Sequence, residues 1–181
     1  DMDAVRIQMR RRAPGSSDLT THRSETDDPL VMSGILNGVT TGAPISAIFR
    51  NKDQNSAAYH PEIPRPSHAD YAATVRFGGH ADLRGGGAFS GRLTACLVFA
   101  GAVCRQILER RGITITANAV RVGQATGKEL NFDMKRAILD ARSAGDSVGS
   151  ELECVVTGVP AGVGGLLFGG MESRIAGMLY A

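Results

Sequence analysis

Tryptophan is absent from this 181-residue chain, and aromatic residues make up only 5% of it. Proteins that bind single-stranded nucleic acid stack bases on aromatic side chains, so the composition disfavours that class. The net charge is only +2, with 20 basic residues interspersed among 18 acidic ones. We therefore expect no general attraction to nucleic acid or to an anionic membrane, and any anion site must be local.

Cysteine and long apolar runs are also scarce. The three cysteines, Cys96, Cys104 and Cys154, are widely spaced, which fits neither a metal-ligand pattern nor an even set of disulfides. We interpret them as buried, reduced thiols of a cytosolic protein. No uninterrupted apolar run approaches the roughly 20 residues that span a bilayer, and no signal-peptide pattern opens the chain. The sequence predicts a soluble, cytoplasmic protein.

The residues that are present predict a folded domain with many tight turns. Hydrophobic residues make up 43% of the chain and charged residues 21%, as in ordinary globular proteins, and there are 23 glycines. The chain starts at Asp1 rather than Met and stops at Ala181 within a helical pattern that no Gly or Pro ends. We expect 1–181 to be a single domain, truncated at both ends.

Helical and strand patterns alternate along the chain. We expect helices at 1–12, 91–111, 133–145 and 171–181, strands at 113–123 and 151–159, a hairpin or meander at 30–51, and loops at 13–29 and 52–76. Ser90 should lie at the N-terminus of the helix that follows it. This order predicts an α+β fold, a layered sandwich of β-sheets and α-helices.

The stretch "RGGGAFSGR", residues 84–92, has the composition of an anion site. Its glycine triplet precedes a helix start, where free backbone N–H groups and the helix dipole favour a phosphate. Arg84 and Arg92 flank the triplet and would add charge. The alternative is a flexible connecting turn.

The stretch "RPSHADY", residues 65–71, places His68 between Arg65 and Asp70. A histidine of ordinary pKa can supply a proton near neutral pH, and a neighbouring carboxylate can orient it. The alternative is a surface histidine or a structural one.

A third cationic stretch is "RRRAPG", residues 10–15, which ends in a turn. Arginine pairs of this kind recognise carboxylate and phosphate groups, although most basic runs are simply solvated. In the polar segment that follows, Arg23 could face inward together with Arg12.

Taken together, these motifs resemble the chorismate synthase family. The stretches that carry the resemblance are "RRRAPG", "LTTHRSETD", "SGILNGVTTGAPI", "RNKDQNS", "RPSHADY", "DLRGGGAFSGRLTA" and "ARSAGDSVGSELECVVTGVPAGVGG". They follow one another in the family's order and cover nearly the whole chain.

The resemblance implies a fold and an activity. Members convert 5-enolpyruvylshikimate 3-phosphate to chorismate by a 1,4-anti elimination of phosphate, in the last step of the shikimate pathway. They need reduced FMN although no net redox change occurs, and NADPH is the candidate reductant. The family fold is a layered sandwich of sheets and helices, assembled as a homotetramer.

The resemblance also implies roles for particular residues. In the family pattern, Arg65, Arg92 and the pair Arg11 and Arg12 correspond to substrate-binding residues. Because Ala13 stands between Arg12 and Pro14, the alignment of this pair with the family motif is open by one residue. Flavin contacts fall to Arg84 and Ser90, and Ser90 also meets the substrate. His68 matches the histidine thought to donate a proton near the reduced flavin.

Some features depart from the family pattern. Ala88 stands where an Arg or His is common, and Asp18 where many members have a basic residue. The family's Gly-Glu-Ser-His-Gly stretch and its C-terminal flavin contacts are absent from these residues. We therefore expect weak or no chorismate synthesis from this chain alone. The alternative to a lyase is a non-catalytic binding or assembly module that keeps the fold.

Overall fold

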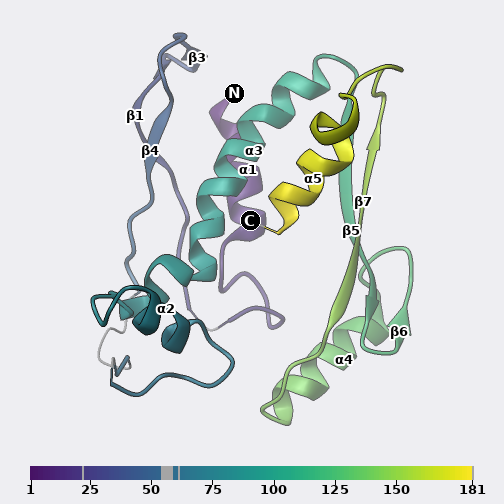
Figure 1. The fold of residues 1–181 in the computed structure, drawn as a ribbon. Helices are drawn as coiled ribbons and strands as arrows, with labels where there is room; N and C mark the ends of the chain where they lie inside the picture. The colour runs from purple at the N-terminus through teal and green to yellow at the C-terminus, as the bar shows by residue number, and fades with distance from the viewer. Residues whose placement is uncertain (22, 54–58, 61, 181) are drawn as a thin grey trace. The chain divides into compact units, whose positions relative to one another are not determined.

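The computed structural model describes residues 1–21, 23–53, 59–60 and 62–180. The chain forms two compact units, Asp1–Cys104 and Arg105–Ala181 (Figure 1). The longest helix, α3 (Thr94–Glu109), begins in the first unit and ends in the second.

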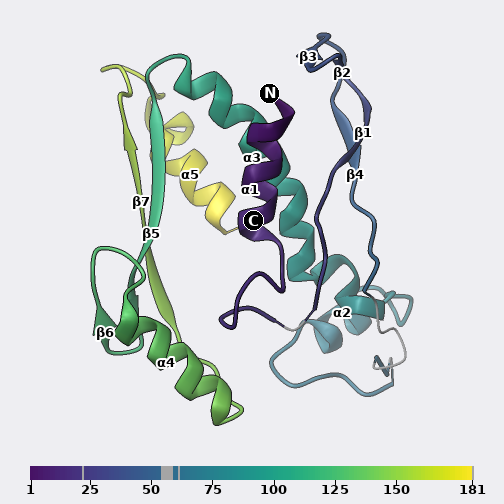
Figure 2. The same ribbon diagram turned by 180° about the vertical axis from the view of Figure 1, so that it is seen from behind.

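In the first unit, helix α1 (Met2–Arg12) lies beside α3 (Figures 1 and 2). Asp1 caps α1, because its carboxylate accepts a hydrogen bond from the backbone N–H of Asp3 at 2.8 Å. The arginines of the last turn favour the negative end of the helix dipole. The core between the two helices consists of Val5, Met9, Ala95, Phe99 and Ala102.

Four short strands of the first unit confirm the predicted hairpin or meander. They are β1 (Leu30–Ser33), β2 (Ile35–Leu36), β3 (Val39–Thr40) and β4 (Ser46–Ile48). Strand β1 pairs with β4 and β2 pairs with β3, both antiparallel. Asn37 and Gly38, which join β2 to β3, both have positive φ, as a two-residue hairpin turn requires.

Beyond β4 the first unit holds a helix that the sequence did not predict. Helix α2 (Asp70–Arg76) falls within the segment 52–76, which was expected to be a loop, and that expectation is wrong here. Asp70 in its first turn and Arg76 in its last complement the helix dipole. Seven residues are too few for a periodic apolar pattern to reveal a helix. Two short 3-10 turns, η2 (Arg84–Phe89) and η3 (Gly91–Leu93), lead into α3.

The second unit contains a three-stranded antiparallel sheet in the order β6-β5-β7. Its elements are β5 (Thr114–Val122), β6 (Ala125–Thr126), α4 (Phe132–Ser143), β7 (Ser150–Thr157), η4 (Leu167–Gly169) and α5 (Met171–Leu179). The predicted strands and helices of this half are confirmed over the described residues, and Ala181 at the end of the predicted helix 171–181 lies outside them. Val122 and Met134 are its buried apolar side chains among the described residues.

The interpretation of the cysteines as buried is wrong. Cys96, Cys104 and Cys154 are free thiols, and all three are exposed. Cys96 and Cys104 lie on α3 and Cys154 lies on β7, which is exposed along its whole length.

The helical stretch Gly91–Glu109 is more apolar than the expectation of no membrane-spanning segment implies. Within the described residues, Gly91–Glu109 is long and apolar enough, with a mean hydropathy of 1.3, to cross a membrane by length and composition. Arg92 and Arg105 interrupt the apolar residues of this stretch, so the sequence contains no uninterrupted apolar run of that length. The same helix supplies Ala95, Phe99 and Ala102 to the core of the first unit.

Candidate functional site

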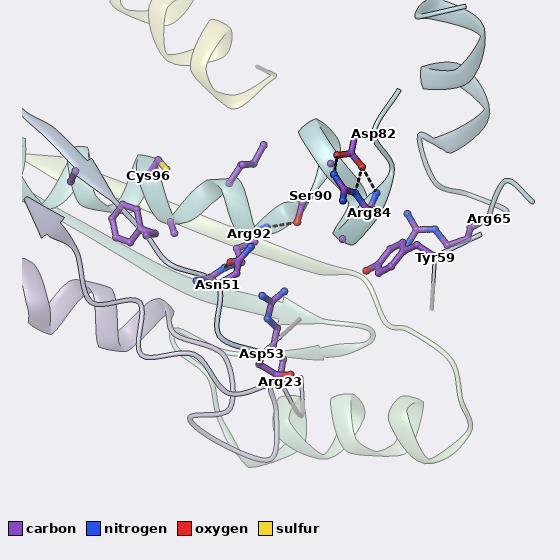
Figure 3. A pocket seen from close by; sticks show the side chains of 16 residues that line it. Arg23, Asn51, Asp53, Tyr59, Arg65, Asp82, Arg84, Ser90, Arg92 and Cys96 are labelled. Carbon is purple, nitrogen blue, oxygen red and sulfur yellow. Dashed lines mark hydrogen bonds and ion pairs between the residues drawn. The ribbon is translucent and has the colours of Figure 1, made fainter. Parts of the chain in front are cut away.

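A pocket of about 950 Å³ in the first unit gathers most of the basic residues expected at an anion site (Figure 3). We call it the arginine pocket after four of its lining residues, Arg23, Arg65, Arg84 and Arg92. Two aspartates oppose these four cations, so the lining carries a net positive charge. The other described residues that line it are Ala47, Phe49, Asn51, Asp53, Tyr59, Asp82, Gly85, Gly87, Ser90, Leu93, Ala95 and Cys96.

The glycine triplet forms one wall of this pocket. Gly85, Gly86 and Gly87 all have positive φ, a backbone conformation that only glycine adopts without strain. A Cβ on Gly87 would lie 2.0 Å from the carbonyl oxygen of Asp82, so the chain passes too closely here for any other residue. Ser90 follows, and its Oγ accepts a hydrogen bond from the backbone N–H of Arg92 at 3.3 Å. Ser90 thus begins the helical segment, as predicted.

Replacing Gly87 by alanine should therefore destabilise the protein strongly. Gly85→Ala is the matched control, because its added Cβ meets nothing within 4 Å and carries only the left-handed backbone cost of roughly 1–2 kcal/mol. For Gly87→Ala we expect a loss of roughly 3 kcal/mol or more in the free energy of unfolding, measured in urea. Equal losses in the two variants would show that the close contact with Asp82 does not matter.

Arg84, next to the triplet, is held by Asp82. Its Nη2 lies 2.6 Å from Asp82 Oδ2, and its Nε donates to Oδ1 at 2.8 Å. These hydrogen bonds from the Arg84 side chain lower the pKa of Asp82 to about 2. Both side chains are exposed, so an anion in the pocket can compete with Asp82 for the guanidinium.

Arg65, also in the pocket lining, is fixed by a two-pronged contact with Asp70. Its Nε and Nη2 donate to the two carboxylate oxygens at 2.7 and 2.9 Å, and its backbone N–H donates to Oδ2 at 3.1 Å. The guanidinium also stacks over the ring of Tyr59, 4.9 Å from the centroid. The sequence predicts that Asp70 orients His68, whereas in the structure the Asp70 carboxylate accepts its hydrogen bonds from Arg65.

This contact predicts an acid dependence of stability. Hydrogen bonds from the side chain and backbone of Arg65 lower the pKa of Asp70 from 3.8 to about 2. A lowered pKa in the folded state stabilises the protein above the unfolded-state value and loses that effect as the pH falls towards the folded-state value. The stability difference between wild type and Asp70→Asn should thus be constant above about pH 5 and shrink between about pH 4 and 2.

Urea unfolding at several pH values would measure this difference, with Arg65→Met as the control. Arg65→Met removes the side-chain donors to Asp70. The difference in unfolding free energy between Arg65→Met and Arg65→Met/Asp70→Asn should therefore depend little on pH. A wild-type difference that stays constant down to pH 2 would contradict the lowered pKa of Asp70.

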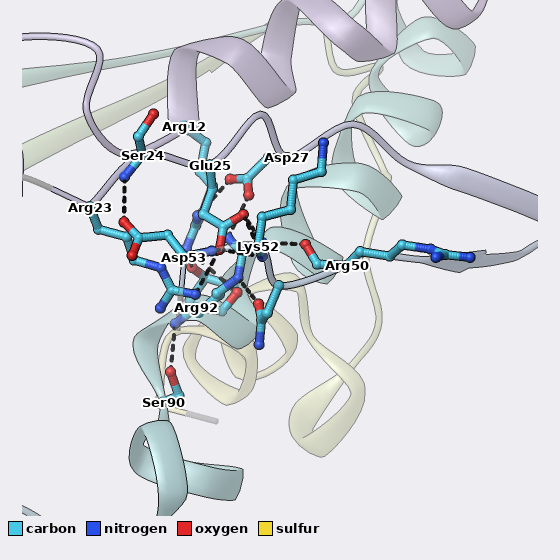
Figure 4. Close-up of polar contacts among 12 residues, drawn as sticks. Arg12, Arg23, Ser24, Glu25, Asp27, Arg50, Lys52, Asp53, Ser90 and Arg92 are labelled. Atoms are coloured by element: carbon cyan, nitrogen blue, oxygen red, sulfur yellow. Dashed lines mark hydrogen bonds and ion pairs between the residues drawn. The ribbon is translucent and has the colours of Figure 1, made fainter. Parts of the chain in front are cut away.

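Behind the arginine pocket, two buried acids hold its deepest arginine (Figure 4). We call Glu25 and Asp27 the carboxylate pair; their side chains are 1% and 0% exposed. Asp27 Oδ1 accepts from Arg92 Nη1 at 2.5 Å, and Asp27 Oδ2 accepts from Arg12 Nη1 at 2.7 Å. Arg92 also donates from Nε to the side-chain oxygen of Asn51. One carboxylate therefore joins the end of α1 to the beginning of α3.

Glu25 holds a second set of groups in place. It accepts hydrogen bonds from Arg23 Nη2 at 2.8 Å and from the backbone N–H groups of Lys52 and Asp53, both at 3.0 Å. Burial alone would raise the pKa of Glu25, but these hydrogen bonds and the charge of Arg92 outweigh burial and leave the pKa lowered. Glu25 is thus a charged anchor for the arginine pocket at neutral pH.

Three of the predicted site residues, His68, Arg11 and Arg12, lie outside the pocket lining. His68 is exposed, and its Nδ1 lies 2.9 Å from the carbonyl oxygen of Pro66. Arg11 is exposed and donates to Gln8 at 3.1 Å, whereas its neighbour Arg12 faces Asp27. Within the pair that the resemblance left open, the geometry brings Arg12 towards Arg92 and leaves Arg11 on the surface.

No motif in the sequence pointed to the carboxylate pair. Arg23, Glu25 and Asp27 are spaced by two residues, and the side chains between them are exposed. In an extended segment this spacing places alternate side chains on one side. This alternation of charged residues, rather than a motif, is the sequence signal for the carboxylate pair, and it lies within the segment 13–29 that was predicted to be a polar loop.

A cofactor with a phosphate group and an apolar ring system, such as the reduced FMN implied by the resemblance, fits the arginine pocket. The net positive lining suits a phosphate, and Phe49 and Leu93 supply apolar surface. The Nε atom of Arg23 is buried and has no hydrogen-bond partner among the described residues, so this cation is not fully satisfied by the protein. Arg84 and Ser90 lie in the same lining.

Comparisons with known proteins extend these observations. The family model of chorismate synthase matches residues 1–181. The chain is 40% identical to a chorismate synthase of Korarchaeum cryptofilum over 99% of its own length and 56% of the relative's. It is 42% identical to a chorismate synthase of Chitinophaga pinensis over 96% of the chain and 50% of that relative.

A solved structure described as a crystal structure of chorismate synthase has a similar fold. The TM-score is 0.70 at 24% identity, over 98% of this chain and 55% of that one. The likeness confirms the predicted α+β class with its combination of sheets and helices. The chain spans about half the length of the curated relatives it matches. Its sequence, matched from end to end by the family model, makes it a member of the chorismate synthase family.

Proposed function

We propose that the protein acts as a chorismate synthase, a lyase that converts 5-enolpyruvylshikimate 3-phosphate to chorismate and phosphate by a 1,4-anti elimination in the presence of reduced FMN. The observation that carries this proposal is the convergence of Arg23, Arg65, Arg84 and Arg92 on one pocket, in a chain of this family. A substrate with a phosphate and carboxylates requires such a group of cations.

Arg65 and Arg92 are the proposed substrate-binding residues of the pocket, with Arg12 acting through the same network. The elimination breaks a C–O bond and leaves negative charge on the departing phosphate. Guanidinium groups that are already oriented stabilise this charge without reorganisation during the reaction. Arg65 is oriented by Asp70 and Arg92 by Asp27, so both meet this condition.

Arg84 and Ser90 are the proposed contacts to FMN. Reduced FMN, when bound, supplies electrons only transiently, since the reaction has no net redox change. Arg84 would pair with an anionic part of the cofactor in exchange for its exposed contact with Asp82. The hydroxyl of Ser90 lies at the start of the helical segment, where it can donate a hydrogen bond while its oxygen accepts from Arg92.

His68 is the proposed proton donor. A carbonyl oxygen only accepts hydrogen bonds, so the contact with Pro66 places a proton on Nδ1, and donation of a proton from Nε2 then requires the doubly protonated imidazolium. Because His68 is not among the described residues that line the pocket, this role requires the loop at 65–69 to approach a bound ligand. The same observation favours the second candidate, a module that binds the anion without turnover.

An anaerobic titration of the purified chain with reduced FMN and 5-enolpyruvylshikimate 3-phosphate tests the proposal. Flavin absorbance and chorismate would be followed together. Chorismate formation supports the lyase, whereas binding of both ligands without chorismate supports the binding module. If neither ligand binds, the proposed site is wrong.

The broader setting belongs to the same proposal. We place the protein in the cytoplasm, working on a small-molecule substrate rather than on nucleic acid or at a membrane. NADPH is the candidate source of electrons for the flavin. A homotetramer is the proposed assembly, by analogy with the family, and a single domain remains the proposed organisation of residues 1–181.

A further inference from the structure

We propose that Asp27 is a positioning residue, which fixes the direction of the Arg92 guanidinium before an anion binds. This inference rests on the proposed function only in so far as Arg92 is taken to hold the anion. Asp27 itself does not line the arginine pocket. It lines a separate cavity of about 880 Å³, so it lies behind the arginine rather than beside a ligand.

The burial of the Asp27 carboxylate supports this positioning role. The Asp27 side chain is 0% exposed, and a carboxylate leaves water only where hydrogen bonds and opposite charges replace it. Here each oxygen takes a different arginine, Oδ1 from Arg92 and Oδ2 from Arg12. The two guanidinium groups carry like charges and approach the same carboxylate. Asp27 neutralises the repulsion between them, while Arg12 Nη2 also donates to Thr94 Oγ1 at 3.2 Å and to the Gly91 carbonyl oxygen at 3.3 Å.

The second argument is the backbone of Asp27, which has φ of 50°. Residues other than glycine seldom adopt this left-handed conformation, although Asp and Asn tolerate it best. The chain thus accepts an unusual conformation at the one position where the carboxylate reaches both arginines.

The third argument is the number of contacts that fix Arg92. Asp27 holds Nη1, Asn51 holds Nε, and the carbonyl oxygen of Arg50 accepts from Nη2 at 3.4 Å. A guanidinium has five N–H groups, so this arrangement leaves others available to the pocket that Arg92 lines. Each of the three nitrogens of Arg92 thus has a protein partner, and Nη2 also lies 3.8 Å from Glu25 Oε2, so the N–H groups left for an anion are the remaining ones on Nη1 and Nη2.

The test compares Asp27→Asn with Asp28→Asn. Asparagine has the shape of aspartate and tolerates positive φ, so the first change removes the charge with little added strain. Asp28 is the matched control, because its side chain is 64% exposed and lies 3.4 Å from Arg6, outside the Arg12–Arg92 network. In protein with ¹⁵N-labelled arginine, the Arg92 side-chain signals, assigned by their loss in Arg92→Lys, report rotation of the guanidinium.

We expect restricted rotation of Arg92 in wild type and Asp28→Asn and fast rotation in Asp27→Asn. Unchanged rotation in Asp27→Asn would overturn the proposal. If Asp27→Asn fails to fold because two arginines then face each other unneutralised, Arg12→Gln/Asp27→Asn removes that repulsion. Its control is Arg12→Gln alone, in which Asp27 should still fix Arg92. Equal rotation in these two variants would likewise overturn the proposal.

A second readout separates this inference from the proposed function. Calorimetric titration with inorganic phosphate and with 5-enolpyruvylshikimate 3-phosphate should show binding roughly 10- to 100-fold weaker in Asp27→Asn, since small misplacement of a binding group has effects of this size. Equal affinities would contradict positioning. If wild type binds neither anion, the proposed function fails, and the rotation of Arg92 still decides whether Asp27 positions it.

Discussion

Replacing Arg92 by alanine is expected to remove most anion binding and to destabilise the first unit as well. Arg92 is only 12% exposed and contacts Asp27, Asn51 and the Arg50 carbonyl. Truncating one partner of a buried charge pair costs roughly 2–5 kcal/mol, which corresponds to a loss of about 30-fold or more in affinity. Calorimetric titration with 5-enolpyruvylshikimate 3-phosphate measures that loss.

Arg92→Ala also leaves Asp27 buried with Arg12 as its remaining cation. Breaking a buried ion pair is costly, so we expect the free energy of unfolding to fall by about 2 kcal/mol or more. Arg92→Lys keeps the charge but not the planar set of donors, and an intermediate loss of affinity should follow.

The matched control is Arg105→Ala on α3, the helix that follows the turn containing Arg92. Arg105 pairs with Glu109 at 2.7 Å, and both side chains are substantially exposed, so its loss should change stability by only a few tenths of a kcal/mol. If Arg92→Ala binds the phosphate ester as tightly as Arg105→Ala does, Arg92 is not a substrate residue. If the two variants are equally stable, the contact with Asp27 contributes little to folding.

The helices and strands with a sustained pattern could be predicted from the sequence. The segment from Thr94 to Glu109 repeats apolar residues at helical spacing, and 114–122 alternates as a strand does. Helix α2 was missed because it is short and follows a stretch rich in proline. Exposure of the cysteines was missed because burial depends on which segments cover a helix face, and composition carries no such information.

The site shows a similar division between local and distant determinants. The glycine triplet and its flanking arginines are local in sequence, so "RGGGAFSGR" was sufficient to group Arg84, Ser90 and Arg92, which line one pocket in the structure. The link between Arg12, Asp27 and Arg92 joins residues 15 and 65 positions apart. Such contacts are set by packing of α1 on α3, which no local pattern encodes. Asp70 was paired with His68 by proximity in sequence, whereas the more strongly basic Arg65 takes the carboxylate.

Replacing His68 by asparagine is expected to lower turnover by about 10²- to 10⁴-fold, the usual contribution of a general acid. The amide nitrogen of Asn can take the place of Nδ1, so the contact with the Pro66 carbonyl is preserved. What is lost is the nitrogen at the Nε2 position, together with the ability to donate a proton. Affinity for 5-enolpyruvylshikimate 3-phosphate should change little, because the cations of the arginine pocket remain in place.

His68→Gln is the complementary variant, since its amide nitrogen extends towards the Nε2 position but does not titrate. If proton donation is the role of His68, both variants lose turnover. If His68 only orients a ligand by a hydrogen bond, Gln should retain most of the activity and Asn should not. Normal turnover in both variants would leave this exposed histidine outside the reaction and assign proton transfer to a group other than His68.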